Sequence, residues 1–271
     1  MVEDWWAVHE AACEKGESAY VDPETGFQVF TRLGLLERGR CCGAGCRHCP
    51  YHHESVSVED RASLIKQPAW LTDARIDTSA GQKRVCLLFW SGGKDSYLAY
   101  RRLQRESDAE IVLLTSFDLT TGNIAHQDLY IETVVAQANH LGVPLIGVPL
   151  HSGRSYLDHI VDALNLTQPQ QLAFGDLHLE HIREWREQTF GSDPRTQELE
   201  LVFPVWQVPY EELVTDLMAA EVKCTVSAVT APELGIAVGD RFDNEFLERL
   251  PESVDAFGEN GEFHTEVSFL T

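Results

Sequence analysis

A short polar stretch with two glycines has the residue types best suited to chemistry. It reads Ser91-Gly92-Gly93-Lys94-Asp95-Ser96 and follows six apolar residues directly. Adjacent glycines let the backbone approach an anion without a Cβ in the way, and the N–H groups at a helix N-terminus attract negative charge. The two hydroxyls, the ammonium and the carboxylate would add donors, charge and a magnesium ligand. This stretch therefore predicts a phosphate site.

The spacing differs from the two common glycine-rich phosphate motifs. The P-loop places four residues between its first glycine and Gly-Lys, and the dinucleotide fingerprint has three spaced glycines. The order Ser-Gly-Gly-x-Asp-Ser after an apolar strand resembles instead the pyrophosphate loop of the N-type ATP pyrophosphatases, the PP-loop enzymes. That resemblance implies ATP as a cofactor, split into AMP and pyrophosphate. The bland alternative is a solvated glycine turn that binds nothing.

A second group of reactive residue types lies near the N-terminus. Four of the seven cysteines fall within nine positions, as Cys41, Cys42, Cys46 and Cys49. Thiolates at this spacing suit zinc or an iron–sulfur cluster, and both remain open. Adjacent cysteines do not easily aim at one centre, so alternative fourth ligands are His48, His52 and His53. The other reading is a loop of free thiols. The segment resembles the small oxidoreductase-like cysteine module found alone or fused in other proteins.

Two later stretches add carboxylates and a histidine. Gly175-Asp176 follows the apolar residue Phe174, and the tail holds Glu259, Glu262 and His264 within six positions. Carboxylates and a histidine this close together suit the binding of an amine, of ammonia or of a second metal, or the removal of a proton. The alternative is a capping aspartate and a solvated acidic tail.

The elements that position these residues alternate between strands and helices. Continuous apolar runs predict strands at 85–90, 111–117, 145–148, 172–174 and 201–206, and helical patterns lie between them, one of them capped by Asp128. This alternation predicts a doubly wound α/β fold with a parallel sheet. Because ligands bind beyond the carboxyl ends of such strands, we expect the polar stretches after Trp90, Ser116 and Phe174 to meet in one crevice.

The composition divides the chain into four parts. We expect a Cys-rich module at 1–55, a linker at 56–81, a nucleotide-binding domain at 82–190 and a substrate domain at 191–271. We expect the linker to be polar with one helix near residues 60–66, and the last part to contain a half-buried strand near 222–228 and a helix at 241–250.

Length and charge narrow the classes of function. The chain has 271 residues, 44% of them hydrophobic, and a net charge of -22. Nucleic-acid binding rests on Lys and Arg, so this charge disfavours a tRNA or DNA partner. Apolar runs are too short to span a bilayer, and the first residues lack the plan of a secretion signal. We expect a cytoplasmic protein without a membrane partner, whose cysteines are thiols or metal ligands rather than disulfides.

Several stretches together resemble the diphthine–ammonia ligase family of ATP pyrophosphatases. They occur in that family's order and are Ser91–Ser96, Phe174–Arg186, Phe203–Trp206 and Gly258–Thr265. The resemblance covers roughly residues 84–271. It implies a five-stranded parallel sheet of the adenine nucleotide alpha hydrolase-like (HUP) type, followed by a smaller α/β domain. It also implies adenosine-side residues after the second strand, namely Ser116, Phe117, Asp118 and His126.

These observations predict an AMP-forming ligase that uses ATP and Mg²⁺. A carboxylate, on a small molecule or a protein, would be adenylated and passed to ammonia or an amine. The residues expected to act are Lys94, Asp95, Asp176, Glu259, Glu262 and His264. One alternative is a sulfur-transfer enzyme acting on tRNA through the cysteine module, and another is a non-catalytic adenine-nucleotide sensor. A homodimer is compatible with each.

Overall fold

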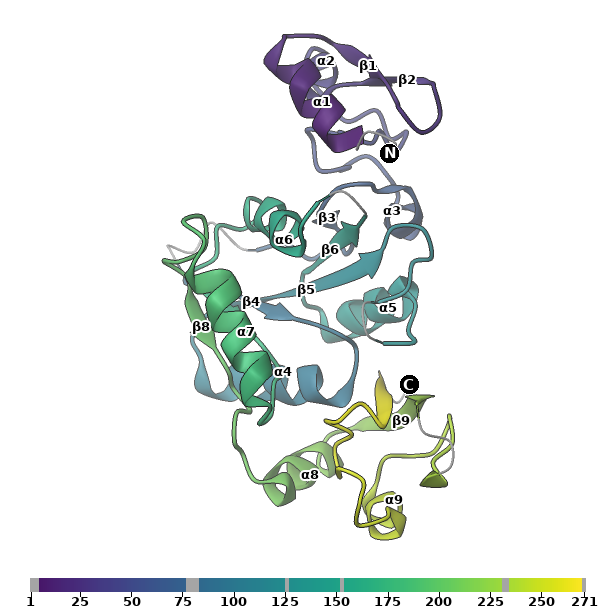
Figure 1. Ribbon diagram of the computed structural model, residues 1–271, viewed down its shortest axis with the longest axis vertical. Coiled ribbons are helices and arrows are strands. Elements are labelled where there is room, and N and C mark those ends of the chain that lie inside the picture. Colours follow the sequence, from purple (N-terminus) through teal and green to yellow (C-terminus); the bar gives the residue numbers. More distant parts are fainter. Residues whose placement is uncertain (1–4, 77–82, 125–126, 152–153, 231–233, 270–271) are drawn as a thin grey trace.

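The computed structural model of this chain contains three parts along its long axis (Figure 1). An N-terminal module lies at one end, a layered α/β unit in the middle and a smaller C-terminal part at the other end. The structure describes residues 5–76, 83–124, 127–151, 154–230 and 234–269. None of the helices in these ranges is long and apolar enough to cross a bilayer.

A six-stranded sheet forms the middle unit. Its order is β3-β6-β5-β4-β7-β8. The strands are β3 (Ala69–Trp70), β4 (Val85–Phe89), β5 (Glu110–Asp118), β6 (Leu145–Leu150), β7 (Gln171–Ala173) and β8 (Glu200–Val202). The last five are mutually parallel, which confirms the predicted parallel sheet. The predicted fifth strand is shorter than expected, because residues 204–207 form a turn.

Helices cover both faces of this sheet, as the alternation along its strands requires. In β4, Cys86 and Leu88 pack on one face with α4 (Lys94–Glu106) and α5 (Ile131–Leu141). Leu87 packs on the other face, with α6 (Tyr156–Leu164) and α7 (Glu180–Gly191). Successive strand residues point to opposite faces, so one apolar run fills two cores. The doubly wound α/β fold is therefore confirmed.

One predicted cap is wrong. The residue that precedes α5 is Tyr130, and it makes no side-chain capping bond; Asp128 lies two residues farther back. The helix is held instead by its packing, since Val134 and Ala138 are fully buried. Tertiary packing of an apolar face stabilises a helix more than a single cap does.

The segment expected to be a linker also supplies structure to the sheet. Helix α3 (Val58–Leu64) lies near the predicted position, and β3 adds an antiparallel edge strand beside β6. The guanidinium of Arg61 is buried and donates to the carbonyl oxygens of Val56, Trp70 and Thr72. These bonds join the helix to the edge strand, so this part of the segment is ordered by contacts that its polar composition did not reveal.

The N-terminal module consists of α1 (Trp5–Glu14), a hairpin of β1 (Ala19–Val21) and β2 (Gln28–Phe30), and α2 (Arg32–Leu36). Two aromatic contacts join it to the middle unit. The ring of Trp5 lies 4.6 Å from that of His151, and the guanidinium of Arg154 lies 4.3 Å from the ring of Trp6. Both partners follow β6, so the module rests near the carboxyl end of that strand.

The C-terminal part contains α8 (Tyr210–Met218), β9 (Val222–Val229), α9 (Asn244–Arg249) and β10 (Phe263–Phe269). Strands β9 and β10 form an antiparallel pair, with a register shift between His264 and Thr265. The first half of the tail forms turns, and its second half is strand β10, which the sequence did not predict. Its alternating residues Phe263, Thr265 and Val267 are buried, a period-2 pattern typical of a half-buried strand.

Candidate functional site

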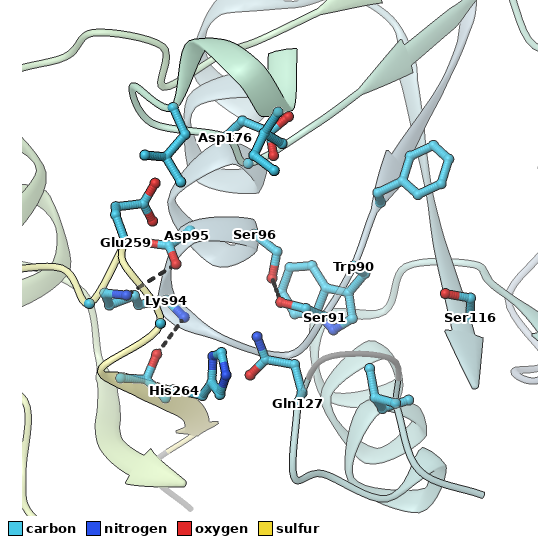
Figure 2. Close-up of a pocket in the computed structure, with 18 of the residues that line it drawn as sticks. Trp90, Ser91, Lys94, Asp95, Ser96, Ser116, Gln127, Asp176, Glu259 and His264 are labelled. Atoms are coloured by element: carbon cyan, nitrogen blue, oxygen red, sulfur yellow. Dashed lines mark hydrogen bonds and ion pairs between the residues drawn. The ribbon is translucent and has the colours of Figure 1, made fainter. Parts of the chain in front are cut away.

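A cavity of about 710 Å³ opens where the strand order of the sheet reverses. Strand β4 lies between β5 and β7, and the chain leaves β4 toward one side and returns to the other. Ligands bind in α/β sheets at such a reversal, beyond the carboxyl ends of the strands. The loop 91–96, the segment 175–179 and the tail 257–265 all contribute to the wall, as Figure 2 shows. We call this cavity the nucleotide pocket.

The pyrophosphate loop, residues 91–96, has the geometry of an anion site. Gly92 has φ of +83°, and Gly93 is the N-cap residue of α4 without a side-chain cap. The first helical N–H, that of Lys94, donates to Thr265 Oγ1, and those of Asp95 and Ser96 in the same turn are left for a ligand. Ser91 Oγ and Ser96 Oγ lie 3.3 Å apart on the pocket wall (Figure 2). A Cβ on Gly175 would come within 2.9 Å of the backbone of Asp95, so glycine is required at that crossing.

Gln137, on α5, is a site residue that sequence reasoning missed. Its amide nitrogen donates to the carbonyl oxygens of Gly92 (3.0 Å) and Val267 (2.7 Å), and its amide oxygen accepts from the indole N–H of Trp90 (2.8 Å). The side chain is 3% exposed, so these bonds are made away from water. A polar residue within an otherwise apolar helical face was the only sequence signal.

The C-terminal strand also binds the pyrophosphate loop directly. The backbone N–H of Val267 donates to Gly92 O (3.0 Å), and the N–H of Lys94 donates to Thr265 Oγ1 (3.2 Å). A Cβ on Gly93 would lie 2.9 Å from Thr265 O. The second glycine is therefore needed for contact with the chain's own tail as well as for approach to an anion.

The ammonium of Lys94 contacts a carboxylate and three aromatic rings of the protein itself. It bonds to Asp95 Oδ2 at 3.1 Å, and three phenyl rings surround it at 5.2–5.7 Å from their centroids. These rings belong to Phe242, Phe257 and Phe263 of the C-terminal part. Cation–π contacts strengthen when the cation is desolvated, and this side chain is 3% exposed. Lys94 lines the pocket and at the same time joins it to the C-terminal part.

Carboxyl groups from three segments converge beside this lysine. Asp95, Asp176 and Glu259 all line the pocket. Burial, followed by the charge of Asp95, raises the pKa of Glu259 to about 8. Burial likewise raises the pKa of Asp95 above its usual range, and Asp176 adds to that shift. Crowded, desolvated carboxylates hold protons because nothing nearby neutralises them fully.

This arrangement fits a magnesium ion. Asp95 Oδ1 is buried and has no hydrogen-bond partner, although Oδ2 is bonded to Lys94. Within the described ranges no three His, Cys, Asp or Glu side chains lie close enough to hold a metal by themselves. Magnesium is commonly held by one or two carboxylates together with substrate phosphates and water, so a complete protein cage is not required.

The remaining predicted residues fall into three groups. Ser116 and His264 line the pocket with the loop. Phe117 is 2% exposed and belongs to the hydrophobic core, and Glu262 accepts from the backbone N–H groups of Asp255 and Asn260, which holds the turn before β10. His126 lies outside the described residues. The structure thus brings most, but not all, of the predicted side chains to one cavity.

An aromatic and basic wall opposite the tail completes the pocket. Arg186 donates to both carboxylate oxygens of Asp176 (3.1 and 3.3 Å) and lies over the ring of Phe174 at 4.5 Å. Tyr156 and Trp185 line the same wall. Gln127 adds a buried amide oxygen without a partner, which can accept an N–H from a ligand. The sequence analysis did not single out Arg186, Tyr156, Trp185 or Gln127 as a site residue.

The cysteines of the module form two pairs. Cys42 Sγ lies 3.4 Å from Cys46 Sγ, and Cys41 Sγ lies 3.9 Å from Cys49 Sγ. Each distance is close to the edge of about 3.8 Å in a tetrahedral zinc–sulfur site, and thiolates are the right donors for zinc or an iron–sulfur cluster. The described residues nevertheless contain no group of three such ligands in metal-binding geometry. A metal at this position stays a prediction.

The histidines near these cysteines belong to the packing of the module. The rings of His9 and His48 stack at 3.5 Å and are nearly parallel, at 5°. His48 Nε2 bonds to the hydroxyl of Tyr20 at 2.9 Å, and His53 Nε2 to the carbonyl of Cys46 at 3.0 Å. Burial lowers the pKa of His9 to about 4 and that of His48 to about 2, so both rings are neutral.

Two family models and two solved structures are similar to parts of this chain. Residues 83–190 match the family model of the diphthamide synthase N-terminal domain, and residues 8–55 match a family of unknown function, DUF5522. A predicted subunit of tRNA methyltransferase from Methanocaldococcus jannaschii is 16% identical, with a TM-score of 0.34, over 69% of this chain and 98% of that chain. The U34-tRNA thiolase NcsA from Methanococcus maripaludis, with its [4Fe-4S] cluster, is 11% identical, with a TM-score of 0.32, over 83% of this chain and 71% of that chain.

The matched range contains the loop 91–96, Asp95 and the helix that carries Gln137, and its strands surround the nucleotide pocket. Residues 83–190 of this chain are therefore similar to the diphthamide synthase N-terminal domain, a domain of the PP-loop ATP pyrophosphatase type, and the segment similar to DUF5522 precedes them.

Proposed function

We propose that the protein is an AMP-forming ligase that adenylates a carboxylate and transfers the acyl group to ammonia or an amine. The observation that carries this proposal is the docking of the tail on the pyrophosphate loop. Through the N–H of Val267 and the hydroxyl of Thr265, the tail brings Glu259 and His264 to the same cavity as the N-terminus of α4. A site that only bound a nucleotide would not require the carboxyl group of Glu259 on the wall formed by the tail.

The loop and the helix N-terminus would bind the β- and γ-phosphates. The N–H groups of α4 that follow Lys94, and the hydroxyls of Ser91 and Ser96 on the pocket wall, would be the donors to these phosphates. The substrate carboxylate would then attack the α-phosphorus, which forms an acyl-adenylate and releases pyrophosphate. Placement of the two reactants accounts for most of the expected acceleration, because neither bond change needs a covalent enzyme intermediate.

Magnesium would be held by Asp95, with Asp176 beside it, and would neutralise phosphate charge when bound. Glu259 would accept the proton of the incoming amine. Its raised pKa of about 8 suits this role, since a general base works best when its pKa is near the working pH. His264, on the same wall, would orient the amine.

The direct test follows oxygen from the acid into AMP. The enzyme is incubated with ATP, Mg²⁺, ammonium and a carboxylate labelled with oxygen-18, beginning with diphthine, the acid that the diphthine–ammonia ligase resemblance implies. The proposal expects pyrophosphate, the amide and AMP that carries one labelled oxygen. Formation of ADP and phosphate, or of AMP without label in a reaction that yields amide, would overturn it.

Label in AMP without amide formation would leave adenylation standing and would exclude ammonia as the acceptor. Replacing ammonium with a panel of primary amines then identifies the acceptor. The tRNA sulfur-transfer alternative is separated in the same way, because it predicts AMP formation that depends on tRNA rather than on a free carboxylate.

A further inference from the structure

The pairing of cysteines in the module is not used by the proposed ligase reaction. The two members of the outer pair are accessible: Cys42 is exposed and Cys46 is half-buried. The inner pair, Cys41 and Cys49, is buried. Adjacent residues 41 and 42 point into different pairs, as expected along an extended chain, where successive side chains face opposite ways.

The loop between Cys42 and Cys46 is built to hold the outer pair together. Gly43 and Gly45 both adopt positive φ, at +73° and +64°. A Cβ on Gly43 would lie 2.9 Å from Ser55 O, and one on Gly45 would lie 2.9 Å from Leu64 Cβ. Both glycines are therefore needed for the fold of the loop and for its contact with the chain behind it. The tight turn sets the Sγ–Sγ distance at 3.4 Å.

This separation suits a bond between the two sulfurs. A disulfide requires a bonded distance of about 2.05 Å, so the two sulfurs, one of them on an exposed side chain, have a short gap to close. The inner pair is farther apart, at 3.9 Å, and its sulfurs are shielded from solvent. Only the outer pair combines proximity with access.

We propose that Cys42 and Cys46 are a redox-active dithiol that exchanges with disulfides. The thiolate of Cys42, the more exposed member, attacks one sulfur of a disulfide RSSR′, which forms a mixed disulfide and releases R′SH. The thiolate of Cys46 then attacks the sulfur of Cys42 and releases RSH. The protein dithiol is oxidised by two electrons, the disulfide is reduced to two thiols, and the protons come from the two cysteines.

The first experiment maps the bond. The full-length reduced protein is incubated with glutathione disulfide as the small-molecule arm or with insulin as the protein arm, alkylated, and cleaved at Arg40 and Arg47. The expected product is the peptide 41–47 with an internal bond between Cys42 and Cys46, while Cys41 and Cys49 carry no bond. A link between peptide 41–47 and the peptide that contains Cys49 would overturn the proposal. The arm that reacts faster identifies the source of the disulfide.

Three substitutions give the kinetic control. Cys42→Ser should lower the rate of thiol release from the disulfide by roughly tenfold or more, because the attacking thiol is gone, whereas Cys46→Ser should release one thiol per chain instead of two and remain as the mixed disulfide, because the resolving thiol is gone. Cys13→Ser, which alters a half-buried thiol outside the loop, should leave the rate unchanged. An equal loss in all three variants would contradict the assignment.

Metal analysis of anaerobically purified protein decides between this dithiol and a four-thiolate metal site. The proposal expects the outer pair to react whether or not metal is added. If one zinc ion or one cluster per chain protects all four thiols from glutathione disulfide, the redox assignment is wrong and the four cysteines are ligands. Both results are independent of the ligase assay, since neither involves ATP.

Discussion

The nucleotide pocket and the N-terminal module both bury ionisable side chains, but they stabilise them by different means. In the pocket, burial and, after it, the charge of Asp95 raise the pKa of Glu259 to about 8. In the module, His9 and His48 stack as neutral rings, and burial lowers their pKa values. The pocket therefore holds a charge imbalance that a cation can relieve, whereas the module's imidazoles are already packed in their neutral form.

Removal of the Asp95 carboxylate, whose buried Oδ1 has no hydrogen-bond partner, should have the largest effect on activity. Asp95→Ala should lower pyrophosphate release roughly 100- to 1,000-fold, because the proposed site loses its most buried magnesium ligand. The measurement is the rate of pyrophosphate release with saturating ATP and acid. Asp108→Ala, an exposed acid just after α4, is the matched control and should be silent. Normal turnover in Asp95→Ala would refute the assignment of the pocket.

The raised pKa of Glu259 gives a signature in the pH profile. In the wild type, turnover should rise with pH until about 8, as this carboxyl loses its proton, and Glu259→Gln should lack that rise and be roughly 100-fold slower at pH 8. Folding stability should respond in the opposite sense. The folded pKa lies above the unfolded value of 4.5, so this carboxyl destabilises the fold increasingly between pH 4.5 and 8.

Thermal unfolding of Glu259→Gln tests the predicted pH dependence of folding stability. The variant should gain stability relative to the wild type at pH 8 and little at pH 4.5. Glu184→Gln, an exposed acid on α7, serves as the control and should show no such dependence. A profile that is the same for wild type and Glu259→Gln would mean that Glu259 is not the group that titrates.

Gln137 tests whether the two walls of the pocket are coupled. Gln137→Leu leaves the indole N–H of Trp90 and the carbonyl of Val267 without their partner, at a cost of about 2–4 kcal/mol in unfolding free energy. The KM for ATP should rise more than kcat falls, since the loop loses its support. Chemical denaturation and steady-state kinetics measure the two effects, and Gln188→Leu, on the exposed face of α7, is the control.

The module should show the smallest effect and the opposite pH dependence. The folded pKa of His9, about 4, lies below its ordinary 6.5, so the stability that the neutral ring contributes is present above pH 6.5 and is lost as the pH falls toward 4. By pH 5 the loss should be about 1–2 kcal/mol for this group. His9→Phe, which keeps a ring in the stack, should reduce that slope.

The control for His9→Phe is His181→Phe, because His181 is an exposed histidine on α7. Two of the six tryptophans, Trp5 and Trp6, lie against His48, so the difference in fluorescence between the wild type and His9→Phe reports the module. The rate of pyrophosphate release should stay unchanged in both variants. A loss of activity in His9→Phe would show that the two regions are not independent.

Much of the middle unit could be predicted because its signals are local. The five parallel strands follow apolar runs, and α6 begins directly after its capping residue Ser155. One prediction failed where long-range packing decided the outcome, because Tyr130 rather than Asp128 precedes α5. Strand β10 was not predicted, and it forms because β9 offers the tail a partner.

The sequence predicted the loop residues of the site, but not the hydrogen bonds that connect the loops to one another. Glycines, serines and acids that follow strands are visible one residue at a time, and the strand order brings them together. Gln137 gave no such signal, because its role depends on Trp90, Gly92 and Val267, which are far from it in sequence. Glu262 was expected at the site by its spacing, yet its carboxylate holds the backbone of the turn.

The sequence by itself determined the sheet, its ligand-binding edge and the loop that faces it, because periodicity and turn chemistry act over a few residues. Tertiary structure alone decided which charges are buried together. Lys94 is enclosed by phenyl rings about 150 or more positions away, burial and the charge of Asp95 together raise the pKa of Glu259, and four close cysteines separate into two pairs. Burial and charge depend on every neighbour in space, and no local pattern records them.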